Sequence, residues 1–179
     1  MNDKMPSLLA GAVGLGTASD FYSDTIKASH QVKCDSSCPD CLRHFRNMQY
    51  HGLLDWRLAI SLLRIFHDKS HCCGLDGNFE AYPEIQDWML TAKREANRVC
   101  QAFGPDGSWS PQKFGTLSGF LINGGKPGII IHPLWHRRSS SGILADAIAE
   151  AEDYGASVIL ADTFNLTRRL SWSRMQWEK

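Results

Sequence analysis

The sequence has no excess of charge of either sign. Its 179 residues include 19 Lys and Arg against 19 Asp and Glu, which gives a formal net charge of zero at pH 7. Proteins that bind nucleic acid on their own usually carry a basic excess. The composition therefore argues against a freestanding nucleic-acid binder, and any contact with DNA must be local or shared with the rest of an assembly.

Long apolar runs are also missing. No stretch approaches the length that spans a bilayer, and residues 1–15 start polar and continue into a short apolar stretch interrupted by glycine, unlike a secretory leader. We therefore expect a soluble, cytoplasmic protein with no membrane partner. With 43% apolar and 21% charged residues, the composition is that of a globular chain that buries a core.

Two catalytic patterns are absent as well. The chain has no G-x-x-x-x-G-K-[ST] loop to cradle nucleotide phosphates, so it is not an ATP-driven motor. No nucleophile, base and orienting group assemble into a recognisable triad. We expect no catalytic activity from this chain alone.

What the sequence does contain is a tight cysteine cluster, Cys34, Cys38 and Cys41, in C-x3-C-x2-C spacing. Zn²⁺ takes thiolate and imidazole ligands tetrahedrally, so three sulfurs in one loop need only one further Cys or His to complete a structural site. The competing interpretation is a set of reduced thiols or a single disulfide. In a reducing compartment clustered cysteines favour a metal, and we predict that these three bind Zn²⁺.

The residues after the cluster form a recognisable pattern. Cys41 runs into Leu-Arg-His-Phe-Arg-Asn47, then a histidine, then Leu-Asp55 and a helix with Ala-x-x-Leu-Leu63. This resembles the MrfA-type zinc-binding domain at the C-terminus of bacterial and archaeal DEAD/DEAH-box (superfamily 2) helicases, over about residues 8–66. The positions in register are Cys38, Cys41, Leu42, Arg43, Phe45, Asn47, His51, Leu54, Asp55, Arg57, Ala59, Leu62 and Leu63.

The resemblance implies a zinc-binding C-terminal module or fragment of a DNA helicase of the DNA-repair or phage-defence type. Such a module is structural and guides DNA without containing the motor. Its partners are the helicase motor domains, in the same or a neighbouring chain, and DNA, which it binds weakly alone.

The fourth zinc ligand is left open. Members of the family commonly have a further cysteine two residues before Cys34, and this chain has Val32 there. The candidates for the fourth position are His30, His44, His51, Cys72 and Cys73.

Arginines surround the cluster and the helix that follows it. Apolar residues at helical spacing predict a helix over residues 55–66, with Asp55 at its N-terminus and Leu58, Leu62, Ile65 and Phe66 on one face. Guanidinium groups bind phosphate without reading sequence, and a solvated face without a partner fits the same periodicity. The predicted DNA-binding residues are Arg43, Arg46, Arg57 and Arg64.

Turn residues around position 75 divide the chain. We expect a zinc-binding module over residues 1–70 and a C-terminal lobe over residues 80–179. The lobe is predicted as a helix (83–103), two strands (115–123 and 128–132) joined by a glycine turn, a second helix (143–154) and a strand (158–161). The predicted class is α+β, with a zinc-bearing loop and helix followed by an α-β-β-α-β lobe.

This order of elements also resembles the restriction-endonuclease-like core, so a degenerate nuclease lobe is the alternative. Nuclease chemistry needs a carboxylate at a strand start and a D/E-x-K pair on the next strand to hold Mg²⁺. Neither predicted central strand has an acid, and Asp162 stands alone. A third interpretation is a zinc-stabilised protein-interaction adaptor.

A second basic region lies towards the C-terminus, where arginines alternate with tryptophans. Such a pattern is typical of a groove that tracks a nucleic-acid strand by charge and stacking, and an edge packed against a neighbouring domain explains it equally well. The residues are Arg137, Arg138, Arg168, Arg169, Arg174, Trp172 and Trp177.

Overall fold

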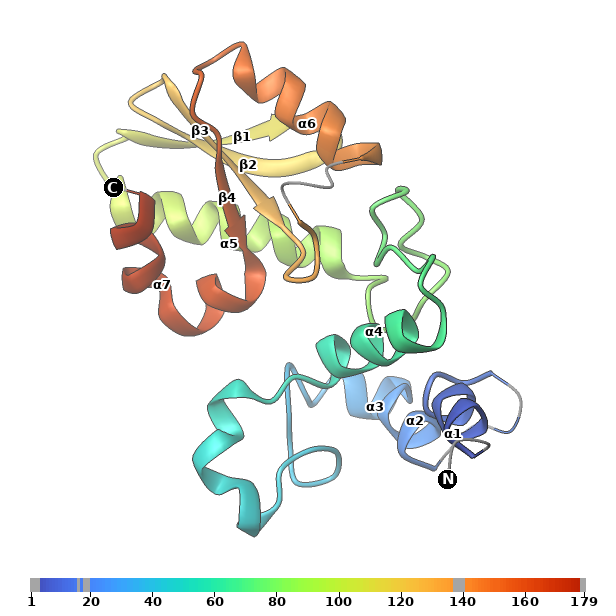
Figure 1. Ribbon diagram of the computed structural model, residues 1–179. Coiled ribbons are helices and arrows are strands. Elements are labelled where there is room, and N and C mark those ends of the chain that lie inside the picture. Colours follow the sequence, from blue (N-terminus) through green and yellow to red (C-terminus); the bar gives the residue numbers. More distant parts are fainter. Residues whose placement is uncertain (1–3, 16, 18–19, 137–140, 178–179) are drawn as a thin grey trace. The chain divides into compact units, whose positions relative to one another are not determined.

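The computed structural model describes residues 4–15, 17, 20–136 and 141–177 (Figure 1). The chain forms two compact units. The first comprises Met1–Cys72 and Glu80–Ile85, and the second comprises Cys73–Phe79 and Gln86–Lys179. Both helices and a four-stranded sheet are present, with a Cys/His cluster on the N-terminal side, in agreement with the predicted mixed class.

The first unit is built from short helices and loops. Its elements are α1 (Met5–Ala12), α2 (Asp20–Thr25), α3 (Ala28–Gln31), the 3-10 segment η1 (Phe45–Leu53) and α4 (Trp56–His67). Its hydrophobic core is a cluster of Tyr22, Cys34, Trp56 and Ile60. One member of this core is therefore a cysteine from the predicted zinc site.

Helix α4 begins where the sequence predicts. The Asp55 carboxylate accepts hydrogen bonds from the backbone N–H groups of Arg57 (3.1 Å) and Leu58 (3.2 Å), which otherwise lack partners in the first turn of a helix. The predicted helix and its N-terminal cap are confirmed.

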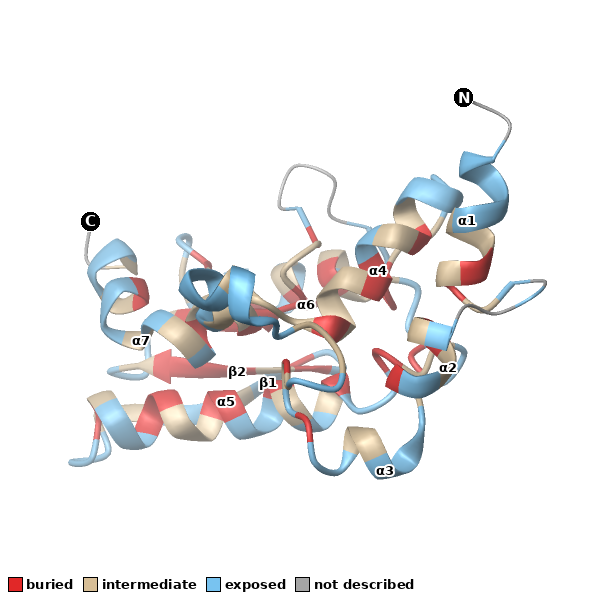
Figure 2. Ribbon diagram, turned by 90° about the horizontal axis from the view of Figure 1, so that it is seen from below, coloured by how far each residue is buried: buried red, intermediate tan, exposed pale blue. Residues whose placement is uncertain are grey.

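The apolar face of α4 that the sequence groups together is not the buried one. Leu62 and Phe66 are exposed, whereas Trp56, Ile60 and Arg64 are buried. Figure 2 shows that α4 contains buried, intermediate and exposed residues. Both faces of this helix carry apolar residues, so periodicity alone does not decide between them. Trp56 and Ile60 face the core because they pack with the cysteine loop.

Arg64 is buried in the first unit, where hydrogen-bond acceptors surround its guanidinium group. Its guanidinium pairs with the Glu84 carboxylate and donates to the Val13 carbonyl (3.0 Å) and the Tyr22 hydroxyl (3.1 Å). Burial by itself lowers the pKa of Arg64, but the hydrogen bond and charge of Glu84 outweigh it and the net shift raises the pKa. A guanidinium enclosed in this way does not reach a DNA phosphate, and the structure corrects the prediction for Arg64.

The second unit contains the sheet. Its elements are α5 (Trp88–Phe103), β1 (Trp109–Phe114), β2 (Leu117–Ile122), β3 (Lys126–Ile131), α6 (Gly142–Glu152), β4 (Ile159–Asp162) and α7 (Thr163–Trp177). The strand order is β1-β2-β3-β4, with antiparallel pairs up to β3 and a parallel pair between β3 and β4. Helix α6 makes the crossover that a parallel pair requires.

Helices cover both faces of this sheet. Helices α5 and α7 contact each other and lie against one face, and α6 lies on the other (Figure 1). The close approach of β2 and β3 depends on glycine, because a Cβ on Gly128 would collide with the ring of Phe120 and one on Gly119 with the Gly128 carbonyl. Layers on both sides explain why Ile129, Ile130 and Ile131 are all buried.

The sequence-based outline of this unit is incomplete. The β2–β3 hairpin is confirmed, with positive φ at Asn123 and Gly124 in its turn. Helix α5 starts at Trp88 instead of residue 83, and α7 was not predicted. Residues 104–114, between a predicted helix and a predicted strand, contain β1. Ser141 precedes α6 and makes no capping side-chain hydrogen bond.

Across the described ranges, no helix is both long enough and apolar enough to cross a bilayer.

Candidate metal centre

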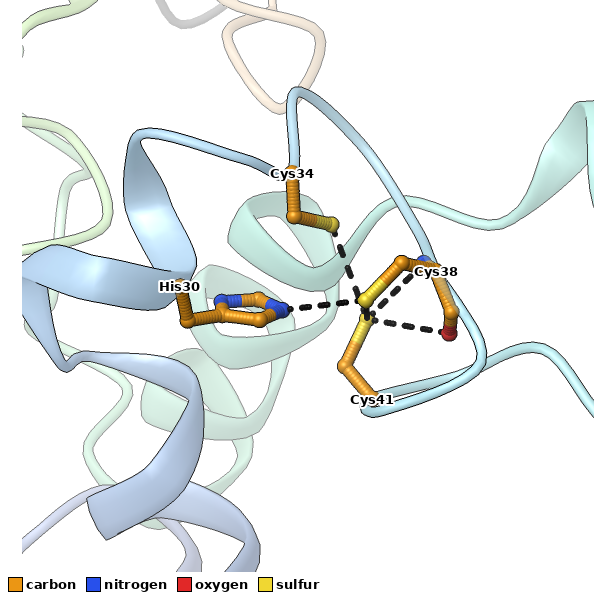
Figure 3. Close-up of side chains that lie close together, drawn as sticks. All are labelled: His30, Cys34, Cys38 and Cys41. Carbon is orange, nitrogen blue, oxygen red and sulfur yellow. Dashed lines mark hydrogen bonds between the residues drawn. The ribbon is translucent and has the colours of Figure 1, made fainter.

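The three predicted cysteines meet a histidine in the first unit (Figure 3). His30 lies in α3, and Cys34, Cys38 and Cys41 lie in the loop between α3 and η1. The sulfur atoms and the imidazole nitrogen all lie within 4.8 Å of one another. This is close enough for one metal ion to contact all four residues.

Three of the six distances between these atoms match those around a tetrahedral zinc ion. The Sγ of Cys41 lies 3.8 Å from that of Cys34 and 3.7 Å from that of Cys38, and the Sγ of Cys38 lies 3.4 Å from Nε2 of His30. Tetrahedral Zn²⁺ with bonds of about 2.3 Å to sulfur and about 2.0 Å to nitrogen separates two sulfurs by about 3.8 Å and sulfur from nitrogen by about 3.5 Å. All six cysteines are free, so no disulfide competes for this cluster.

The His30 ring is oriented by its second nitrogen. Nδ1 lies 2.8 Å from the Thr25 carbonyl oxygen, which accepts a hydrogen bond only from a protonated ring nitrogen. A neutral imidazole with its proton on Nδ1 directs the Nε2 lone pair towards the sulfurs. Hydrogen bonds of this kind fix the tautomer and strengthen histidine as a metal ligand.

The start of α4 holds the cysteine loop in place. The Cys34 carbonyl accepts hydrogen bonds from the Trp56 indole (3.2 Å) and the Arg57 guanidinium (3.4 Å), and the Trp56 backbone N–H donates to the Ser36 carbonyl (2.8 Å). The Arg57 guanidinium also stacks on the Trp56 ring, 4.2 Å from its centre. Trp56, which the sequence analysis did not single out, thus joins the loop to the helix.

Burial raises the pKa of the Cys34 thiol to about 12, and the neighbouring Cys38 and Cys41 thiols add to the rise. Without a cation, this environment therefore favours the neutral thiol of Cys34 over its thiolate. A metal ion reverses the preference and releases protons as it binds. The Cys38 backbone N–H, 3.2 Å from the Cys41 sulfur, supplies a donor to the same cluster.

The other candidates for the fourth ligand have different roles or positions. The ring of His44 accepts a hydrogen bond from the Arg46 N–H, and Nε2 of His51 lies 3.0 Å from the Asn47 side-chain oxygen, so both histidines support η1. Cys72 and Cys73 are not part of the cluster. Val32 is 87% exposed and lies midway in sequence between His30 and Cys34.

The predicted DNA-binding arginines divide into three environments. Arg43 and Arg46 are exposed, although Nε of Arg43 donates to the Ser37 hydroxyl (3.0 Å). Arg57 is half-buried against the cysteine loop, and Arg64 is buried in its ion pair. Only Arg43 and Arg46, which follow the last cysteine, present their charge openly.

Among its described residues, the second unit does not bring acidic side chains together as a nuclease site requires. Strands β2 and β3 contain no acidic residue, and the Asp162 carboxylate caps α7 by accepting from the Asn165 backbone N–H (2.8 Å) and side-chain amide (2.7 Å). A metal-dependent nuclease needs acidic ligands at the strand edge. Asp162 acts as a helix cap.

Within the described residues, the second basic region pairs its arginines with aromatic rings. Trp177 packs against Phe103 and Phe120, and Arg174 lies over the Phe103 ring. Arg168 stacks on Phe164, and Arg169 stacks on the exposed ring of Trp172. Arg137 and Arg138 lie outside the described residues. The alternation of Arg and Trp is explained largely by packing of α7.

Comparison with known proteins identifies a short similarity. No protein-family model matches the chain, and no solved structure matches it. The chain is similar to Druantia protein DruE from Escherichia coli (strain UMEA 4076-1), with 38% identity over 52 residues. The match covers 29% of this chain and 3% of that protein, so the chain corresponds to a very small part of the relative's length.

Proposed function

We propose that this chain is a zinc-binding C-terminal module of a DEAD/DEAH-box DNA helicase of the DNA-repair or phage-defence type. It is either a fragment of the motor's own chain or a separate partner, and it guides DNA without hydrolysing ATP. The observation that carries the proposal is the close approach of His30, Cys34, Cys38 and Cys41, whose ligand atoms lie within reach of a single ion. The cluster lies within the segment that resembles the helicase module.

The size of the detected similarity supports a module within a larger assembly. The 52 matched residues make up only 3% of the relative. A segment of that size fits one structural module in a much longer protein. A neutral chain of 179 residues that depends on other domains for most of its DNA affinity agrees with this arrangement.

In the proposed mechanism, zinc positions arginines beside the DNA backbone. A bound ion would fix residues 34–41 against the start of α4. Arg43 and Arg46 follow shortly after the last ligand, Cys41. Contacts between guanidinium groups and phosphates fix the register of a strand without reading its sequence. Such contacts suit a part that keeps DNA aligned while a motor moves it.

DNA binding by the zinc-loaded full chain tests this function. Fluorescence anisotropy with labelled DNA at several salt concentrations, with and without the helicase motor domains, compares the parent with Arg43→Ala/Arg46→Ala. We expect weaker binding to all sequences and a salt dependence that flattens by about one contact per arginine. A matched control, Lys93→Ala/Arg94→Ala, removes two exposed charges from α5. Identical affinity and salt slope for the Arg43/Arg46 variant and the parent would refute the DNA-guiding role.

A second candidate, a degenerate nuclease lobe, is favoured by one observation. The order α5-β1-β2-β3-α6-β4, with a mixed sheet and helices on both faces, agrees with the nuclease-like core that the sequence suggests. Because β2 and β3 have no acid, we expect no cleavage of single- or double-stranded DNA with Mg²⁺ or Mn²⁺. Metal-dependent nicking that disappears in Asp162→Ala would favour this candidate over a guide.

The adaptor interpretation predicts a different binding profile. A zinc-stabilised adaptor binds the helicase motor domains and adds nothing to their affinity for DNA. The anisotropy measurements with and without the motor domains separate the two cases, because a guide increases DNA affinity in the complex.

A further inference from the structure

The segment η1 exposes apolar side chains to an unusual degree. None of its nine residues is buried, and Phe45 and Tyr50 are 82% and 52% exposed. Met48 and Leu53 are exposed as well. Neither aromatic ring contacts another ring within the described residues. A concentration of exposed apolar side chains on one short element is typical of a binding surface.

Hydrogen bonds hold this segment in one conformation. The Asn47 side-chain oxygen accepts from the His44 backbone N–H (2.8 Å) and its amide donates to the Leu42 carbonyl (2.9 Å). His51 lies within hydrogen-bonding distance of the same Asn47 oxygen (3.0 Å). The exposed rings are therefore carried on a preformed frame, which lowers the entropic cost of binding.

The charge of the segment selects the class of ligand. Residues 41–54 contain Arg43 and Arg46 and no Asp or Glu. The nearest acids along the chain are Asp40 and Asp55, and the Asp55 carboxylate is engaged in capping α4. The guanidinium of Arg46 makes no hydrogen bond to the described part of the chain. Cationic groups beside open aromatic rings match a polyanion that also presents flat apolar faces.

We propose that Phe45 and Tyr50 form a stacking platform for the bases of single-stranded nucleic acid, with Arg43 and Arg46 binding its phosphates. This inference rests on the proposed function and deepens it, because it specifies a single strand instead of a duplex. Bases in a duplex cover one another's faces, whereas an unpaired base stacks on any accessible aromatic ring. An apolar protein surface would not use the two open arginines.

The test separates stacking from charge in the zinc-loaded full chain. The variant Phe45→Leu/Tyr50→Leu keeps apolar volume but removes both rings. Fluorescence anisotropy with labelled oligo-dT, which has no secondary structure, should show about a tenfold or greater loss of affinity. The slope of log affinity against log salt should stay at the parent value, because no phosphate contact is removed. Binding to a blunt duplex should not change.

Three comparisons complete the experiment. Phe66→Leu changes another exposed phenylalanine, on α4, and should leave oligo-dT binding unchanged. Phe45→Trp enlarges the stacking face and should tighten binding to oligo-dT. Zinc content and thermal melting of each variant should match the parent, because the altered rings are exposed.

The outcomes distinguish this inference from the proposed function. In one outcome, Phe45→Leu/Tyr50→Leu binds oligo-dT like the parent, while Arg43→Ala/Arg46→Ala binds more weakly with a flatter salt slope. The stacking proposal is then wrong, and the DNA-guiding role stands. If Phe45→Leu/Tyr50→Leu loses equal affinity for oligo-dT and for the duplex, the stacking proposal is also wrong. If the parent binds neither DNA, or neither variant changes binding, both proposals fail.

Discussion

The two units reach a folded state by different means. The second unit buries a continuous core of apolar side chains between a sheet and helices on both faces, whereas only six of the buried apolar side chains among the described residues belong to the first unit. In the first unit, Cys34 is itself part of the core with Tyr22, Trp56 and Ile60. Small scaffolds below about 80 residues usually add a metal or a disulfide to such a core. We therefore predict that metal binding and folding are coupled in the first unit and that the second unit folds without a metal.

The largest effect should come from removing a metal ligand. Cys38→Ser or Cys41→Ser should abolish binding of about one zinc ion per chain and unfold the first unit, because binding energy at a structural zinc site is folding energy. The second unit should stay folded. Metal analysis by mass spectrometry, with hydrogen exchange followed separately in peptides of each unit, measures both effects.

The matched controls are Cys72→Ser, a half-buried cysteine of the first unit outside the cluster, and Cys100→Ser in the second unit. Neither should change zinc content. Stable folding of the first unit in chelator, or equal and small effects for all four variants, would mean that the cluster is a set of ordinary thiols.

The second largest effect should come from the buried ion pair of the first unit. Glu84→Gln leaves the Arg64 charge enclosed without its counterion, and breaking a buried pair in this way costs about 3–5 kcal/mol. The control is Glu80→Gln, an exposed glutamate four residues earlier. Denaturant unfolding monitored by hydrogen exchange should locate the loss in the first unit. Equal stability of the two variants would contradict the role of the pair.

Arg64 also shows what the sequence leaves undecided about the fold. Capping by Asp55 and the hairpin turn at Asn123 were predictable because the responsible residues are local. The buried face of α4 was not, because its choice depends on Glu84, twenty residues away, and on the cysteine loop. Strand β1 was missed because its Pro111 and exposed polar residues give no strand pattern without the pairing of β2.

Three of the four residues of the candidate metal centre were predictable from the sequence. The spacing of Cys34, Cys38 and Cys41 is visible in one loop, but five residues remained possible for the fourth position. Two contacts place His30 at the fourth position of the cluster. It lies one helical turn before Cys34, whose backbone N–H donates to the His30 carbonyl (2.9 Å), and the Thr25 carbonyl orients its ring. Four-residue spacing between His30 and Cys34 was the available signal.

The two units should also respond oppositely to pH. Burial raises the pKa of the Cys100 thiol to about 11 from its ordinary 9.0, so the second unit has this stabilisation below pH 9 and loses it as pH rises towards 11. The loss should amount to about 2 kcal/mol. In acid, protons compete with zinc for thiolates, so the first unit should unfold there first.

Stability of the second unit measured from pH 8 to 11, in the parent and in Cys100→Ala, isolates this effect. The alanine variant should lose stability less steeply above pH 9. If both proteins follow the same alkaline curve, ionisation of Cys100 does not contribute.

The smallest effects should come from the two aspartate caps, one in each unit. Asp55→Ala should destabilise the first unit and Asp162→Ala the second, each by about 1 kcal/mol, because each carboxylate accepts N–H groups from the first turn of a helix. Asparagine at either position keeps an acceptor and should cost less. Thermal melts of the four variants test this. An Asp162→Asn effect as large as that of Asp162→Ala would indicate a role for the charge beyond capping.

The compactness of the metal site along the chain has a consequence for the order of assembly. All four ligands lie between His30 and Cys41, so closing the loop around an ion costs little chain entropy. Trp56 and Arg57, which brace this loop, come later in the sequence. During synthesis the ligands emerge before α4 exists, so zinc capture is able to precede formation of the core. An ion bound at that stage would give Trp56 an ordered loop to pack against.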